Sequence, residues 1–188
     1  ALDYAGKTDW RLPSPLELQS IMEDTQAASL VDTSVFPNLG DSSFWTSTAF
    51  AGNSDEAYYG QLGLGFINHG LKSDNHHVVC VRGTEPVMSS HFIESTAFSA
   101  NIVTDLLTGL VWQAQTDSGT DWRQALANCE ASTVAGFGDW RLPTNKELSS
   151  LVDYTSSSPA SDFPNVTSST FWSSTTYKAD PNRAWFTR

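Results

Sequence analysis

Two glutamates at matching places in the chain are the first candidates for chemistry. Glu17 and Glu147 each follow the motif Asp-Trp-Arg-Leu-Pro. Paired carboxylates are the usual apparatus of a glycosidase, in which one acid protonates the leaving oxygen. Each glutamate, however, lies three residues after a hydroxyl residue, Ser14 or Thr144, and this is the spacing of a capping box at a helix start. We therefore assign both glutamates to helix capping and predict no catalytic residue.

The repeated Asp-Trp-Arg residues have a structural interpretation. A Trp before a Leu-Pro turn into a capped helix is a packing anchor, and the neighbouring Asp and Arg are expected to satisfy local backbone groups or to pair with one another. A second repeated block contains Phe-Trp flanked by Ser and Thr. The predicted structural anchors are Trp10, Arg11, Glu17, Trp45, Trp140, Arg141, Glu147 and Trp172.

Three histidines, His69, His76 and His77, raise the question of a metal site. Adjacent histidines in a strand point to opposite faces, and no pair of Cys or His has zinc-ligand spacing. The oxygen-rich stretch that contains Asp55 and Glu56 offers hard ligands for calcium, although turn-forming residues explain the same letters. We expect no cofactor and no transition metal, with calcium at Asp55 and Glu56 as a weak candidate.

Composition and charge exclude several classes of function. The 188 residues carry 21 acidic against 10 basic side chains, a net charge of −11. Phosphate binding needs clustered Lys and Arg, so a nucleic-acid partner is excluded. The chain has no apolar run long enough to span a membrane, which predicts no membrane insertion. It also lacks a nucleophile elbow, a P-loop and a dinucleotide fingerprint, and we expect it not to be an enzyme.

An internal repeat organises the chain. The run GKTDWRLPSPLEL returns as GFGDWRLPTNKEL, with Trp10 matching Trp140, and Trp45 matches Trp172 in a later block. An offset of 127 to 130 residues exceeds the length of a solenoid unit, so each copy is a domain. We predict a first module at 1–83 that lacks its N-terminal part, a linker at 84–98, and a second module at 99–188 that lacks its C-terminal part.

Local patterns predict the elements of each module. A short helix should follow Ser14 and Thr144, and another is expected at DWRQALANCEAS, where apolar residues recur at helical spacing. Strands are expected where aromatic and β-branched residues cluster, as in SFWTSTAF, AYYGQLGLGF, HHVVCVRG, TGLVWQ, STFWSSTTY and RAWFTR. The fold class is α+β, with short helices and an antiparallel sheet in each module.

The ordered blocks TGLVWQ, W-x-x-A-x-x-x-C, DWRLP-x-x-x-EL, FP, FWSST and CVRG resemble the Lcl C-terminal domain family, a bacterial family named for a collagen-like adhesin. The resemblance implies a C-type-lectin-like fold, in which short helices pack on a small twisted sheet, and non-catalytic binding of glycans or surface proteins. The alternative is a structural or assembly domain of a larger surface protein, and the second alternative is an enzyme of the formylglycine-generating type.

The resemblance also implies where ligands and disulfides lie. Lectin-like folds carry the ligand surface on loops between the aromatic strand and the terminal strand. Aromatic faces there stack on sugars, and amides and carboxylates bond hydroxyls. The implied disulfide joins the long helix to the CVRG strand, which here means Cys80 with Cys129. Either the two modules exchange segments and form this bond, or each cysteine lacks its own partner. The ligand-binding candidates are Asn53, Asp55, Tyr58, Asn68, Asp74, Asn75 and His76.

These expectations together describe a protein outside the cytoplasm. The chain is expected to be secreted, displayed at the cell surface or periplasmic in a bacterium. Its expected partners are a glycan or a surface protein. A homo-oligomer or a domain-exchanged assembly is the expected form of self-association.

Overall fold

The computed structural model divides the chain into two compact units. Unit 1 contains residues 1–87 with 154–157 and 177–180, and unit 2 contains the remainder. Each unit is described by itself. The residues that the structure describes are 3–23, 31–85, 91–95, 102–114, 119–157, 160–164, 169–177 and 180–187.

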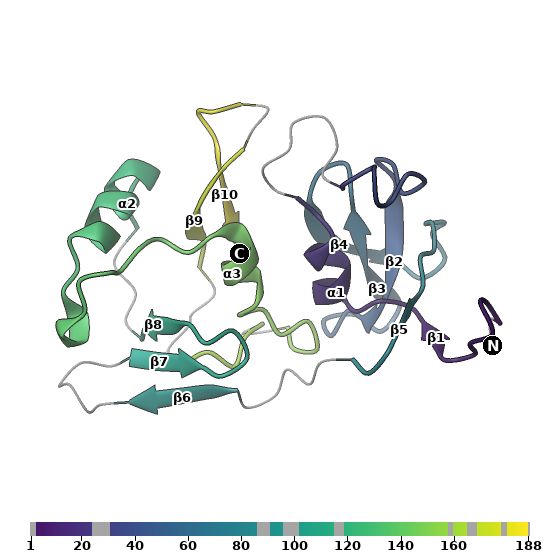
Figure 1. Cartoon of the computed structure of the whole chain (residues 1–188), viewed down its shortest axis with the longest axis horizontal. Coiled ribbons are helices and arrows are strands. Elements are labelled where there is room, and N and C mark those ends of the chain that lie inside the picture. The colour runs from purple at the N-terminus through teal and green to yellow at the C-terminus, as the bar shows by residue number, and fades with distance from the viewer. Residues whose placement is uncertain are drawn as a thin grey trace. The chain divides into compact units, whose positions relative to one another are not determined.

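The described residues of unit 1 form one helix and two antiparallel sheets (Figure 1). The larger sheet has the order β2-β3-β4, so that consecutive strands are neighbours, and β1 pairs with β5 in a smaller sheet. A parallel bridge adds His77 beside Phe44 of β2. The elements are β1 (Trp10–Arg11), α1 (Pro15–Ser20), β2 (Ser43–Ala49), β3 (Glu56–Gln61), β4 (Phe66–Leu71) and β5 (Val81–Arg82).

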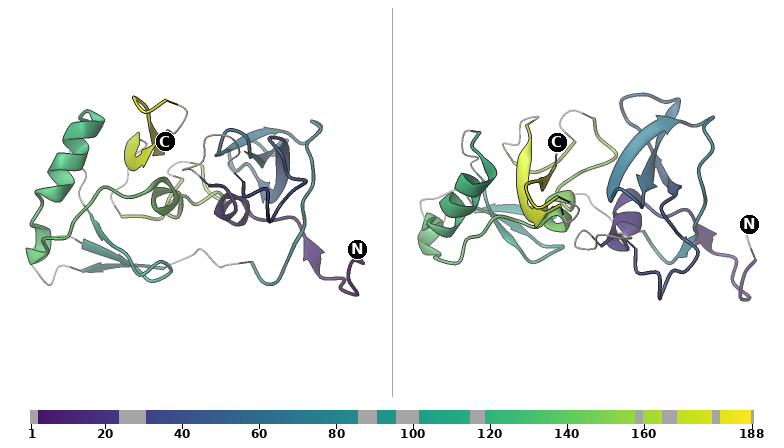
Figure 2. Two further views of the ribbon diagram at one scale, coloured as in Figure 1. Left: turned by 45° about the horizontal axis from the view of Figure 1, so that its top comes forward. Right: turned by 90° about the horizontal axis from the view of Figure 1, so that it is seen from above.

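The core of unit 1 lies between α1 and one face of the β2-β3-β4 sheet, which Figure 2 shows from two further sides. Leu18 and Met22 are fully buried and cover Gly60 of β3. A Cβ at Gly60 would lie 2.5 Å from Leu18 Cδ2, so the helix approaches the sheet closely only because this position has no side chain. Phe44 of β2 completes this layer. The part of the inner face that α1 covers is therefore apolar.

Unit 2 contains a three-stranded sheet of order β6-β7-β8, a hairpin of β9 and β10, two α-helices and a 3-10 turn (Figure 1). Val103, Ala114 and Phe163 form its buried cluster. The elements are β6 (Phe92–Ser95), β7 (Ile102–Asp105), β8 (Val111–Gln113), α2 (Trp122–Glu130), η1 (Val134–Gly136), α3 (Asn145–Ser149), β9 (Phe171–Thr176) and β10 (Ala184–Thr187).

The predicted fold class is confirmed at the level of α+β with few helices and small antiparallel sheets. Both capping boxes are present, at Ser14 with Glu17 and at Thr144 with Glu147. Helix α2 covers most of the predicted second helix. Among the described residues, no helix has the length and apolar character needed to cross a membrane.

One element was not expected, and one expectation needs correction. Within the predicted linker 84–98, the described residues Phe92–Ser95 form β6, because Phe92 and Ile93 pair with β7 in a regular antiparallel ladder. The other linker residues at 86–90 and 96–98 lie outside the described residues. The disulfide expected between Cys80 and Cys129 is not formed in the structure. The described residues within 103–132 lie in unit 2.

Candidate functional site

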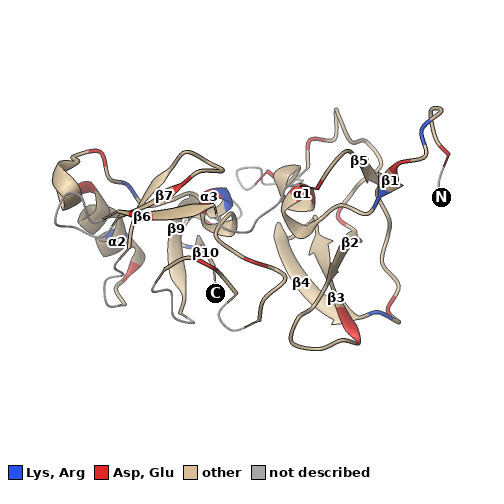
Figure 3. Cartoon of the chain, turned by 90° about the horizontal axis from the view of Figure 1, so that it is seen from below, with Lys and Arg blue, Asp and Glu red and all other residues tan. Residues whose placement is uncertain are grey.

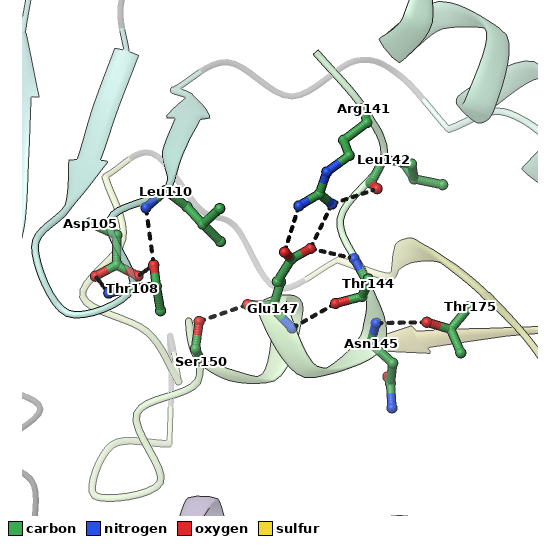
Figure 4. A network of polar contacts seen from close by, with 10 residues as sticks. All are labelled: Asp105, Thr108, Leu110, Arg141, Leu142, Thr144, Asn145, Glu147, Ser150 and Thr175. Carbon is green, nitrogen blue, oxygen red and sulfur yellow. Dashed lines mark hydrogen bonds and ion pairs between the residues drawn. The ribbon is translucent and has the colours of Figure 1, made fainter. Parts of the chain in front are cut away.

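The most repeated residues of the chain form a closed network at the start of α3 (Figure 4). The Arg141 guanidinium donates two hydrogen bonds to the Glu147 carboxylate, at 2.7 and 2.6 Å. The same carboxylate accepts from the backbone N–H of Thr144 at 2.8 Å, and Thr144 Oγ1 accepts from the backbone N–H of Glu147. The three residues thus satisfy one another at the helix start.

Electrostatics confirm that this carboxylate stays ionised. The hydrogen bonds from Arg141 lower the pKa of Glu147 from 4.5 to about 2, against the opposing effect of burial. Glu17 has the same partners in unit 1, namely Arg11 and Ser14, and its pKa is lowered for the same reason. A carboxylate that is ionised and fully hydrogen-bonded has no proton to donate near neutral pH. These glutamates therefore have a structural role.

The pairing of the arginines differs from the sequence-based expectation. Arg11 and Arg141 pair with the glutamate of the capping box, six residues later, and not with the aspartate two residues earlier. Asp9 instead pairs with Arg82, which closes the β1-β5 sheet. The local backbone contact that we expected is also present, because Arg11 donates to the carbonyl of Leu12.

The two units repeat further contacts around this network. The indole N–H of Trp10 donates to the carbonyl of Tyr4, and that of Trp140 to the carbonyl of Val134, in each case six residues earlier. In the following hairpin, Trp45 faces Tyr59 edge to face at 6.1 Å. Unit 2 has the same geometry, with Trp172 and Phe186 at 6.0 Å. The arginine network, the capped helix and the aromatic hairpin therefore form one structural motif that both units contain.

This repetition agrees with comparison to known families. The Lcl C-terminal domain family matches residues 1–82 and 101–188, which together cover most of the chain. The chain belongs to the Lcl C-terminal domain family. It carries two partial copies of the domain, as the sequence resemblance predicts. No curated protein and no solved structure matched the chain.

The candidate binding site of this Lcl C-terminal domain is the outer face of the β2-β3-β4 sheet. Trp45 and Tyr59 point away from the core because they alternate with the buried Phe44 and Tyr58. His76 joins them by stacking on Tyr59 at 4.2 Å and meeting Trp45 edge to face at 4.4 Å. We call Trp45, Tyr59 and His76 the aromatic face. All three side chains are partly exposed.

Hydrogen bonds fix the position of His76. The following residue, His77, donates its backbone N–H to the carbonyl of Ser43, and its carbonyl accepts from the N–H of Trp45. The segment therefore runs along the free edge of β2 and places the His76 ring over the sheet. Its Nε2 atom is buried and has no hydrogen-bond partner among the described residues. A buried polar atom of this kind needs a water or a ligand to satisfy it.

Polar side chains border the aromatic face. Asn68 of β4 lies directly opposite Tyr59 in the ladder and is exposed. Asp74 and Tyr59 meet above Gly70. A Cβ added to Gly70 would lie 3.2 Å from Asp74 Oδ2 and 3.3 Å from the Tyr59 ring. Asn75 follows in the exposed turn. Four of the predicted ligand-binding residues, Asn68, Asp74, Asn75 and His76, thus lie on or beside the aromatic face.

The other three candidates lie elsewhere. Tyr58 is only 8% exposed and points to the inner face, where Phe50 and His69 meet its ring. Asn53 uses its amide to hold Glu56, and its carbonyl oxygen accepts from the N–H of Asp55. These contacts stabilise the β2-β3 turn.

The weak calcium candidates lie at this turn. The Glu56 carboxylate is bound by Asn53 and by His69, and these hydrogen bonds lower its pKa, with that from His69 the larger cause. Asp55 is exposed. Within the described ranges, no group of three or more His, Cys, Asp and Glu side chains is placed to hold a metal.

Unit 2 has a buried polar cluster that sequence reasoning missed. The Asp105 carboxylate is fully buried and contacts His91 Nδ1 at 2.7 Å. It also accepts hydrogen bonds from the Thr108 hydroxyl and the backbone N–H of Leu107. Burial alone would raise the pKa of Asp105, but the hydrogen bonds of Thr108 and His91 outweigh it and lower the pKa. The cluster fixes the turn between β7 and β8.

The charge of unit 1 is strongly acidic, as Figure 3 shows along its ribbon. Residues 1–87 contain 11 Asp and Glu against 4 Lys and Arg. Three of these cations are engaged within the unit. Arg11 pairs with Glu17, Arg82 pairs with Asp9, and Lys72 donates to the carbonyl of Ser54. The field outside unit 1 therefore favours positively charged ligands over sulfated or phosphorylated ones.

Proposed function

We propose that the chain is a non-catalytic binding module with a C-type-lectin-like fold, secreted, periplasmic or displayed at the surface of a bacterium. Its ligand is a glycan or a surface protein. The observation that carries the proposal is the aromatic face, where partly exposed Trp45 and Tyr59 have polar neighbours in Asn68 and Asp74. Aromatic rings beside amides and carboxylates are the elements with which proteins recognise sugars and peptide side chains.

The carboxylates support a role without catalysis. Glu17 and Glu147 are each held by an arginine and a helix start, and Asp105 is fully buried. None of these three is free to exchange a proton with a substrate. Binding, in contrast, needs only the exposed groups of the aromatic face.

The repeat offers a matched experiment. Tyr59→Ala removes a ring from the aromatic face, and Phe186→Ala removes the ring at the corresponding hairpin position of unit 2. We would apply the intact chain and both variants to an array of bacterial and host glycans, and confirm folding by circular dichroism. Loss of one stacked ring is expected to weaken binding about tenfold.

The outcomes separate the proposal from its alternatives. The proposal is supported if a ligand binds the parent chain and Phe186→Ala with equal affinity but binds Tyr59→Ala more weakly. If both substitutions weaken binding equally, the aromatic face is not the specific binding site. Turnover of any array glycan by the parent chain would contradict a non-catalytic role.

A further inference from the structure

We infer that the aromatic face selects a sugar that carries a free, positively charged amino group. This inference rests on the proposed function and names the ligand class of the same site. It comes from four observations in unit 1: the rings, the Asp74 carboxylate, the unsatisfied His76 nitrogen and the overall charge.

The rings supply two kinds of attraction to such a ligand. Trp45 and Tyr59 stand at 88° to each other, so their π faces point in different directions over the same patch of sheet. A π face attracts the C–H groups of a sugar ring, and it attracts a cation within about 6 Å through its quadrupole. An amino sugar presents both groups on one ring.

The Asp74 carboxylate is placed to complete this site. It borders the same point above Gly70 as the Tyr59 ring, so an ammonium group bound at this point lies within reach of the carboxylate. Asp74 is exposed, and within the part of the chain that the structure describes its carboxylate forms no hydrogen bond or ion pair. Its charge is therefore available to a ligand.

Two further features favour an amine over other substituents. His76 Nε2 is buried beside the rings without a hydrogen-bond partner among the described residues, and it can accept a hydrogen bond from an N–H group of a ligand where binding shifts the side chains that cover it. The acidic excess of residues 1–87 attracts an ammonium group and repels a sulfate, phosphate or uronate. A neutral N-acetyl group would keep the ring stacking but lose the contribution of Asp74.

The test uses three tetrasaccharides as probes with the intact chain. They are β-1,4-linked glucosamine, β-1,4-linked N-acetylglucosamine and a heparin-derived tetrasaccharide, and binding is measured by NMR titration of the indole and histidine-ring signals. We expect the glucosamine tetramer to bind about tenfold more tightly than the acetylated tetramer, and the heparin fragment not to bind. Shifts should concentrate at Trp45 and His76.

Two charge variants decide whether Asp74 acts by contact. Asp74→Asn should reduce the preference for the amine over the acetylated tetramer to within about twofold. Asp139→Asn makes the same change in net charge at an exposed position of unit 2 and should keep the full preference. Equal losses in both variants would overturn the inference, because the preference would then reflect net charge alone.

The remaining outcomes separate the inference from the proposed function. Equal binding of the amine and the acetylated tetramer at the aromatic face overturns the inference and leaves glycan binding in place. Binding of none of the three tetrasaccharides overturns the inference, while the glycan array still decides the proposed function. Tighter binding of an acetylated trilysine peptide than of the glucosamine tetramer would also overturn it, in favour of a basic protein partner.

Discussion

Glu147→Gln tests the repeated arginine network most directly. Glutamine at the same position can still cap the helix, so the substitution removes the charge while keeping the shape. The shift of the Glu147 pKa from 4.5 to about 2 corresponds to roughly 3 kcal/mol at full value. The Arg141 side chain is 55% exposed, however, and water screens the pair. We therefore expect the variant to lose about 1 to 2 kcal/mol of unfolding free energy in unit 2.

The loss should depend on pH in a defined direction. Because the folded pKa of Glu147 is below its ordinary value, the stabilisation is fully present above about pH 4.5 and fades as the pH falls toward 2. The difference in unfolding free energy between the parent chain and Glu147→Gln should therefore decrease as the pH falls over this range. Hydrogen exchange of the buried Val103 amide reports the stability of unit 2 without requiring the whole chain to unfold in one step.

Two comparisons make the result interpretable. Glu130→Gln changes the same charge at an exposed helix end and should cost less than about 0.5 kcal/mol. Glu17→Gln removes the same network from unit 1 and should cost a similar amount, about 1 to 2 kcal/mol, in that unit. A loss below about 0.5 kcal/mol for Glu147→Gln, or a difference that stays constant down to pH 2, would refute the reasoning.

Three other predictions concern unit 2 and the cysteines. Asp105→Ala should cost about 3 kcal/mol or more, seen as a lower urea midpoint, because it leaves buried donors unsatisfied. Trp122→Phe should cost about 1 kcal/mol and speed amide exchange in α2, since it removes the 2.7 Å hydrogen bond to the Ser173 carbonyl. The intact mass should be the same with and without reductant, because no disulfide joins Cys80 and Cys129; a heavier reduced chain would contradict this.

The elements that the sequence predicts correctly are those set by local signals. A capping box requires only two residues three positions apart. The sequence alone therefore predicts the boxes of Ser14 with Glu17 and of Thr144 with Glu147. Helix α2 likewise starts directly after the capping residue Asp121. Strand β6 was missed because its sequence has no alternation of apolar and polar residues, and only its pairing with β7 makes it a strand.

The candidate site is only half predictable. Their place in the sequence between the aromatic strand and the terminal strand suggests Asn68, Asp74, Asn75 and His76, although Asn68 lies in strand β4 and not in a loop. The Tyr pair at 58 and 59 is ambiguous from sequence, since adjacent strand residues face opposite ways and nothing local says which way is inward. The contact of α1 with Gly60 decides it, and that contact depends on the tertiary fold.

The pairing of β1 with β5 has a mechanical consequence. Trp10 lies opposite Arg82 and Arg11 opposite Val81, so the chain enters and leaves this part of unit 1 at the same end of a two-residue ladder. Tension along the chain would break the residue pairs of the ladder one after another, beginning beside the exposed ion pair of Asp9 and Arg82. The ladder would therefore yield at low force and lengthen the chain while the β2-β3-β4 sheet and its aromatic face remain folded.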